Sequence, residues 1–160
     1  MLATIKSEAQ NKLTTSDQVT ISGKVKTEMT FTISELDKLT KTNVGDVTFM
    51  EGKEVKYTGH DIKGISLKQL FEKISFDNET HKALNKFYFV LEAPDGYKVV
   101  FSYNEIFSPI TCNNFFLVTD YDGKNITVMG DRILVISCND AKQGHKSVKG
   151  LNKIIVKEAD

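Results

Sequence analysis

The residues best equipped for binding chemistry lie near the C-terminus, in the stretch GHKSVKG at positions 144–150. This stretch combines two glycines with His145, Ser147 and the lysines Lys146 and Lys149. Backbone N–H groups, a hydroxyl and ammonium groups are the donors that an oxyanion such as phosphate requires. The alternative is a solvated loop whose lysines serve solubility. Residue types alone favour that alternative, because an anion site also needs a particular backbone shape.

A second glycine-bearing stretch, GHDIKGIS at positions 59–66, has the glycine separation of a nucleotide-binding P-loop. Ile65 stands where that motif requires the lysine that contacts the phosphates. The stretch therefore lacks the cation of the motif. We expect a glycine-containing loop that enters a helix capped by Ser66.

The histidines and cysteines are not spaced like metal ligands. They are His60, His81, His145, Cys112 and Cys138. No two of them have the close separation of a zinc site on one helix or hairpin, so solvated histidines are the favoured interpretation. Cys112 could act as a nucleophile only beside a base, which sequence does not reveal. Cys138 follows an apolar run and is expected in or near the core.

Length and composition indicate one globular domain. The chain has 160 residues, is 40% hydrophobic and 26% charged, and has a formal net charge of +0. This balance is ordinary for a soluble protein and gives no reason to expect nucleic-acid binding. No apolar run is long enough to span a membrane, and the first residues have no apolar region of the kind that would lead us to expect a signal peptide. We expect a polar tail over residues 1–16 and a single domain over residues 17–160; two cysteines leave the compartment open.

Alternating and helical patterns place these residues on an α+β fold with mixed sheets and short helices. Strands or hairpins are expected over residues 18–25, 47–57, 87–102, 115–129, 132–137 and 153–157. Short helices are expected over residues 34–39, 66–76, 79–85 and 102–107. In the second of these helices, Ser66 and Gln69 have the spacing of a capping box. The candidate loop at 144–150 then leads directly into the last strand.

Several of these stretches, taken in order, resemble the molybdopterin-binding domain of the sulfite oxidase family. They are GHDIKGISLKQLFEKI, FYFVLEAPDGYKVVFSYNEIF, FLVTDYDGKNI, GDRILVIS and GHKSVKGLNKIIV. The last is similar to the family ending G-x-x-S-V-K-W-L-x-x-I-x-V, and Arg132 in GDRILVIS matches the arginine of a P-L-R-L-V-V-P strand. The resemblance spans about residues 19 to 157 and implies an α+β fold like that domain.

The resemblance also implies a role for the candidate loop. In the family, this final motif helps to hold the phosphate of the pterin cofactor. Ser147 and Lys149 would take that role here, with His145 or Lys146 as nearby donors, and molybdopterin would be the ligand. Family members work with molybdenum as oxidoreductases. The resemblance implies a periplasmic or extracytoplasmic location if a signal peptide has been removed.

Departures from the family pattern argue against catalysis. The family binds molybdenum through a cysteine ahead of the glycine-led loop, whereas that region here contains Met50 and no cysteine. A neutral thioether does not replace a thiolate ligand. Gly150 stands where the final motif has tryptophan, and tryptophan is absent from the chain.

Three hypotheses remain at this point. The first is a non-catalytic binding or accessory module with a retained anion or pterin-phosphate pocket, which the missing thiolate favours. The second is an active molybdenum oxidoreductase whose metal ligand comes from elsewhere. The third is a structural or protein-interaction domain without a cofactor; no particular protein partner is indicated.

Overall fold

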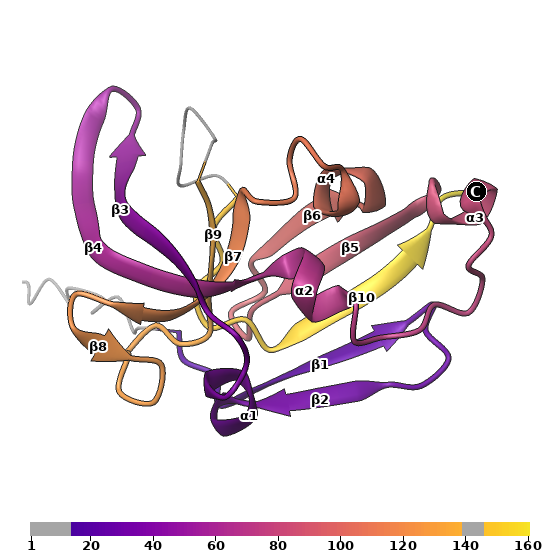
Figure 1. The fold of residues 1–160 in the computed structure, drawn as a ribbon, viewed down its shortest axis with the longest axis horizontal. Helices are drawn as coiled ribbons and strands as arrows, with labels where there is room; N and C mark the ends of the chain where they lie inside the picture. Colours follow the sequence, from indigo (N-terminus) through magenta and orange to yellow (C-terminus); the bar gives the residue numbers. More distant parts are fainter. Residues whose placement is uncertain (1–13, 139–145) are drawn as a thin grey trace, which may run out of the picture.

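A computed structural model describes residues 14–138 and 146–160 of the chain. In these residues, ten strands form two five-stranded sheets (Figure 1). In the same part of the chain, four helices of four or five residues lie in the connections between strands. The helices are α1 (Ile33–Asp37), α2 (Leu67–Phe71), α3 (His81–Leu84) and α4 (Tyr103–Phe107). Mixed sheets with short helices confirm the predicted α+β class.

The first sheet has the strand order β2-β1-β10-β5-β6. Its strands are β1 (Gln18–Gly23), β2 (Met29–Thr32), β5 (Phe87–Glu92), β6 (Lys98–Ser102) and β10 (Lys153–Glu158). The C-terminal strand β10 lies in the centre, parallel to β1 and antiparallel to β5. The sheet is therefore mixed, and the segment that enters β10 is held between β1 and β5, through backbone hydrogen bonds of Asn152 with Thr20 and Glu92.

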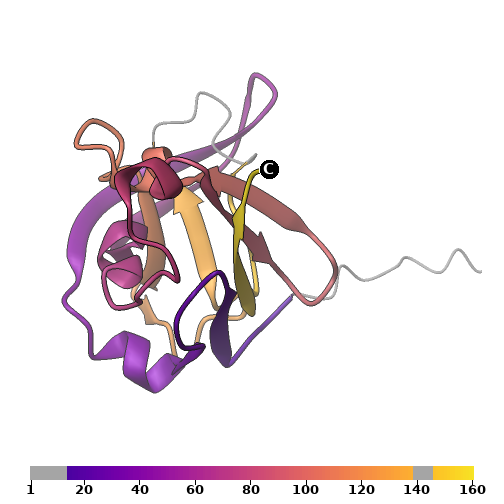
Figure 2. The same ribbon diagram turned by 90° about the vertical axis from the view of Figure 1, so that its right-hand side faces the viewer.

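The second sheet runs β3-β4-β7-β8, with β9 also paired to β7. Its strands are β3 (Thr42–Glu51), β4 (Glu54–Ser66), β7 (Phe115–Tyr121), β8 (Lys124–Asn125) and β9 (Leu134–Ser137). The outer part of the β3–β4 hairpin projects from the rest of the molecule (Figures 1 and 2).

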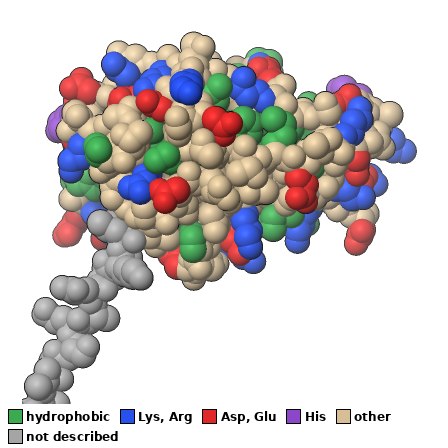
Figure 3. All heavy atoms as spheres, turned by 90° about the horizontal axis from the view of Figure 1, so that it is seen from below, with side chains coloured by type: hydrophobic (Ala, Val, Ile, Leu, Met, Phe, Trp, Pro, Cys, Tyr) green, Lys and Arg blue, Asp and Glu red, His purple; other side chains and the backbone are tan. Residues whose placement is uncertain are grey.

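One hydrophobic core joins the two sheets. It contains Ile21 and Phe89 from the first sheet and Ile65 and Leu117 from the second, each fully buried. Alternation of buried and half-buried residues along β5 produces the inward row that the sequence predicts for residues 87–102. Acidic and basic side chains are interspersed over the face shown in Figure 3. None of the described helices has the length and apolar character needed to cross a membrane.

The stretch at residues 59–66 is a strand, and its assignment as a loop was wrong. It forms the second half of β4, where Ile62 and Ile65 are buried and Ser66 pairs with Phe116. Gly64 packs so closely under β7 that an added Cβ would lie 2.7 Å from the Leu117 carbonyl oxygen. Glycine at this position allows the two strands to approach closely. In the sequence alone, such a glycine cannot be told from one in a loop.

The helix starts differ in detail from the predictions. Ser66 caps α2 as predicted, and its hydroxyl accepts from the Gln69 N–H. The side chain of Gln69 donates instead to the Thr40 carbonyl, so the reciprocal half of the predicted capping box is absent from this described helix. Helix α1 begins earlier than predicted, because Thr32 and Glu35 form a complete capping box.

Candidate functional site

The candidate loop lies along the second sheet. Val148 exchanges two backbone hydrogen bonds with Val135 in β9, at N···O distances of 2.8 and 2.9 Å. Three residues later the Leu151 N–H donates to the Ile133 carbonyl at 2.9 Å. These bonds fix residues 146–151 beside residues 131–135, and the chain then enters β10 of the first sheet. The loop therefore bridges the two sheets.

The three predicted site residues differ in how far the structure describes them and in their exposure. His145 lies outside the described residues. Ser147 is half-buried, and Lys149 is exposed. The Lys149 Nζ lies 4.0 Å from Oδ2 of Asp131, while about half of the lysine side chain remains exposed to solvent. Ser147 and Lys149 are thus two residues apart on one fixed segment, and their proposed role as anion ligands stays a prediction.

Asp131 is the buried centre of this region, because only 7% of its side chain is exposed. Its Oδ1 accepts a hydrogen bond of 3.1 Å from the Tyr121 hydroxyl. Burial and the nearby Asp131 charge raise the pKa of Tyr121, so the phenol stays protonated. The same two causes raise the pKa of Tyr57 to about 12. Asp131 therefore faces Tyr121 on one side and Lys149 on the other.

The other lysine of the loop is held more firmly. Lys146 Nζ lies 2.5 Å from Glu105 Oε1 and 5.0 Å from the centre of the Phe101 ring. Burial opposes ionisation of Glu105, but hydrogen bonds from Lys146 and from the Ser102 N–H hold its pKa below the ordinary value. This pair anchors the loop to the N-terminus of α4. Of the two lysines, Lys149 has the looser carboxylate contact.

Arg132 follows Asp131 in the segment beside the loop. Its Nε and Nη2 donate to one carboxylate oxygen of Asp17, at 2.9 and 2.7 Å. Its Nη1 donates to the Met129 carbonyl at 3.1 Å. The segment beside the loop therefore carries a guanidinium of fixed orientation.

Gly150 occupies the position of the tryptophan in the family motif, and its surroundings leave no room for a side chain. Its φ is +70°, and an added Cβ would lie 2.6 Å from Thr14 Cγ2 and 2.7 Å from the Thr14 carbonyl oxygen. Its carbonyl accepts a 2.7 Å hydrogen bond from the Ser16 hydroxyl. Thr14 and Ser16 thus lie against Gly150, the position at which the resembling motif has tryptophan.

The sulfur-bearing residues lie elsewhere. Met50 pairs with Val55 in the projecting β3–β4 hairpin. Cys112 is buried in the turn after α4, and Cys138 follows β9. Burial raises the pKa of Cys138 to about 11. No group of three or more His, Cys, Asp or Glu side chains is arranged to hold a metal ion in the part of the chain that the structure describes.

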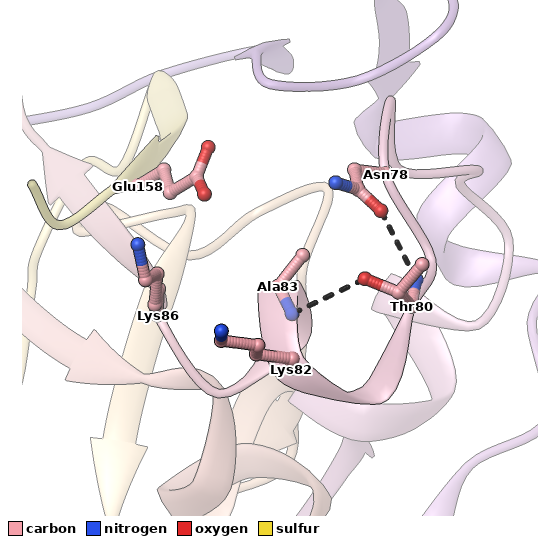
Figure 4. A pocket seen from close by; sticks show the side chains of 6 residues that line it. All are labelled: Asn78, Thr80, Lys82, Ala83, Lys86 and Glu158. Carbon is pink, nitrogen blue, oxygen red and sulfur yellow. Dashed lines mark hydrogen bonds between the residues drawn. The ribbon is translucent and has the colours of Figure 1, made fainter.

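A separate surface hollow lies by α3 (Figure 4). Its lining residues are Asn78, Thr80, Lys82, Ala83, Lys86 and Glu158. The Asn78 side chain accepts from the Thr80 N–H at 3.1 Å, and the Thr80 hydroxyl accepts from the Ala83 N–H at 3.3 Å. These are the contacts of a turn and a helix cap. They account for the side chains of Asn78 and Thr80 without a ligand.

Comparison with solved structures shows that the two-sheet fold of this chain is a known one. The chain is similar to the sulfane dehydrogenase SoxCD from Paracoccus pantotrophus, with a TM-score of 0.60 and 12% sequence identity. The fold is shared. The match covers 89% of this chain and 38% of that chain, so this chain spans well under half of the SoxCD chain. At the level of sequence, no family model and no curated protein matches the chain.

Sequence reasoning missed the acidic partners of the two loop lysines, Asp131 and Glu105. Asp131 and Arg132 are adjacent in the sequence, directly before an apolar run. Nothing in the neighbouring residues indicates that the Asp131 carboxylate is buried. Glu105 has a sufficient local role as a capping residue, which concealed its contact with Lys146. Both contacts join segments that are distant in the sequence.

Proposed function

We propose that this chain is a non-catalytic binding module with a molybdopterin-domain fold, which retains an anion site at Ser147 and Lys149. The ligand class is an oxyanion, with the phosphate of a pterin as the favoured example. The distant structural resemblance to a molybdenum-cofactor oxidoreductase supports the pterin, by analogy of fold rather than by site geometry.

The geometry of Lys149 carries the proposal. Its Nζ lies 4.0 Å from Asp131 Oδ2, which is too far for a direct hydrogen bond, and about half of the lysine side chain is exposed, so its donors are open to an external anion. The loop backbone is fixed by Val148 and Leu151 on both sides. A site of this kind requires little rearrangement before it binds.

The metal part of the cofactor does not fit the residues described. A thiolate ligand is expected in the segment that here contains Met50, and Met50 lies on the projecting hairpin. The raised pKa of Cys138 keeps its thiol protonated at neutral pH. We therefore assign no reaction step to a metal.

The test is analysis of protein purified from a molybdenum-replete host. The proposal expects no stoichiometric molybdenum, and expects a pterin phosphate or inorganic phosphate to bind in a manner that depends on Lys149. Stoichiometric molybdenum together with a pterin would contradict it and would favour the active-oxidoreductase hypothesis.

A second candidate is a structural or protein-interaction domain. One observation favours it: three cations near the loop each face a carboxylate, in the pairs Lys146–Glu105, Lys149–Asp131 and Arg132–Asp17. Their charges balance, which lowers the attraction for an external anion. Absence of any phosphate binding by the wild-type protein would select this candidate.

A further inference from the structure

Residues 14–17, here called the N-terminal strap, tie the two segments of the candidate site together. The Ser16 N–H donates to the Arg132 carbonyl at 2.6 Å, and the Ser16 hydroxyl donates to the Gly150 carbonyl at 2.7 Å. Ser16 is buried, at 8% exposure. A segment about 115 residues away in sequence therefore crosses the junction of the loop and the strand beside it.

The last strap residue places a carboxylate on the guanidinium of Arg132. A single oxygen of Asp17 accepts from both Nε and Nη2. The two partners differ in exposure: 23% of the Arg132 side chain is accessible against 73% of Asp17. Arg132 is also held by the Met129 carbonyl. The cation is thus fixed, and the carboxylate is the partner that can leave.

We propose that Asp17 is an internal competitor for the anion site, so that the strap regulates oxyanion binding by occupying Arg132. This proposal rests on the proposed function. A phosphate presents several oxygens to the two parallel N–H donors of a guanidinium, whereas Asp17 uses one oxygen. An exposed ion pair is weak, so an oxyanion that reaches the guanidinium displaces Asp17 and gains Arg132 as a ligand.

The close packing at Gly150 is independent evidence that the N-terminal strap is held against the loop. Thr14 lies where a side chain at position 150 would project, and Thr14 also donates a 3.1 Å hydrogen bond to Asp95 in the β5–β6 turn. The strap is therefore attached at both of its ends. Release of the Asp17 end leaves Ser16 and Thr14 in place, so the chain keeps its fold while Arg132 becomes available.

The experiment is titration of the full chain with inorganic phosphate by calorimetry, for the wild type, Asp17→Asn and Asp77→Asn. Asp77 is the matched control, because it is a partly exposed carboxylate paired with Lys24 at the opposite end of β1. We expect Asp17→Asn to tighten phosphate binding by roughly threefold to fivefold, the factor that corresponds to an exposed ion pair. The Asp77→Asn variant changes net charge equally and should leave affinity within about twofold.

The outcomes separate the two proposals. Equal affinities for the wild type and Asp17→Asn, combined with weaker binding by Lys149→Ala, would overturn the strap proposal and leave the anion site intact. Equal tightening by both aspartate variants would also overturn it, since net charge would then be the cause. Binding that Lys149→Ala does not weaken would overturn the proposed function, whatever the strap variants show.

Discussion

Lys149 and Asp131 lie 18 positions apart in the chain, yet their charged groups are 4.0 Å apart, with the Asp131 side chain almost completely buried and the Lys149 side chain about half exposed. The backbone register around the Val148–Val135 bridge produces this pairing. The buried acid fixes one side of the lysine, while the other side faces solvent. This asymmetry is the physical basis for the anion site proposed at Ser147 and Lys149.

Replacement of Asp131 by asparagine should destabilise the protein. The change removes the charge that faces Lys149 and forces an amide into a site shaped for a carboxylate that accepts from Tyr121. We expect a loss of about 1–3 kcal/mol in the free energy of unfolding, measured with urea. Tyr121→Phe removes only the hydroxyl partner and should cost less than Asp131→Asn. An Asp131→Asn variant as stable as the wild type would show that the carboxylate contributes nothing.

Gly150→Ala should be more destabilising than Gly123→Ala. Both glycines have nearly the same φ, +70° and +72°, but an added Cβ meets nothing within 4 Å at Gly123 and meets Thr14 at Gly150. The backbone cost of about 1 kcal/mol is shared, and the steric cost applies to Gly150 alone. The difference in urea midpoints measures that contact. Equal midpoints would mean that the strap moves away without cost.

The His60–Asp46 pair should make stability depend on pH. A 2.9 Å hydrogen bond joins them, and it raises the pKa of His60 while it lowers the pKa of Asp46. A raised histidine pKa gives a contribution that is complete below about pH 6.5 and is lost as pH rises through the folded-state value. A lowered aspartate pKa gives one that is complete above about pH 4 and is lost on further acidification.

The measurement compares the wild type with His60→Gln by urea unfolding at pH 6 and pH 8.5. The stability advantage of the wild type should be larger at pH 6, though small because both groups are exposed. His81→Gln serves as the control, since His81 lies beside Asn85 instead of an aspartate. An advantage that grows toward pH 8.5 would contradict the assignment.

Cys138 should react slowly with thiol reagents. Its pKa is raised from 9.0 to about 11, so its thiolate fraction at neutral pH falls by about 100-fold. The measurement is the rate of reaction with a disulfide reagent in a Cys112→Ser variant, folded and in denaturant. Folded protein should react far more slowly. A folded rate equal to or above the denatured rate would indicate an activated thiol instead.

Local signals were sufficient to predict much of the fold. The hairpin at residues 87–102 has both its alternation and its Asp95–Gly96 turn in sequence, and Ser102 with Glu105 forms the capping box that their spacing indicates. The second half of β4 was missed, because Gly59 and Gly64 mark close packing there rather than a loop. A glycine that allows close strand packing and a glycine in a loop look the same in the sequence.

The candidate site was predictable only in part. The donors Ser147 and Lys149 are visible in the sequence, but their surroundings depend on contacts between distant segments. Asp131 reaches the loop through the pairing of β9, and Asp17 reaches Arg132 because the strap crosses the site. Such long-range contacts leave no periodicity for a sequence to display.

The most direct test of the anion site is the affinity of the full chain for inorganic phosphate, measured by calorimetry for the wild type and Lys149→Ala. Lys157→Ala is the matched control, because Lys157 is an exposed lysine on β10 and its loss changes the net charge equally. Loss of a charged hydrogen bond of about 1.5–3 kcal/mol predicts that Lys149→Ala binds phosphate about tenfold to a hundredfold more weakly. The control should bind like the wild type. Equal affinities for the wild type and Lys149→Ala, or no binding by the wild type, would contradict the proposed site.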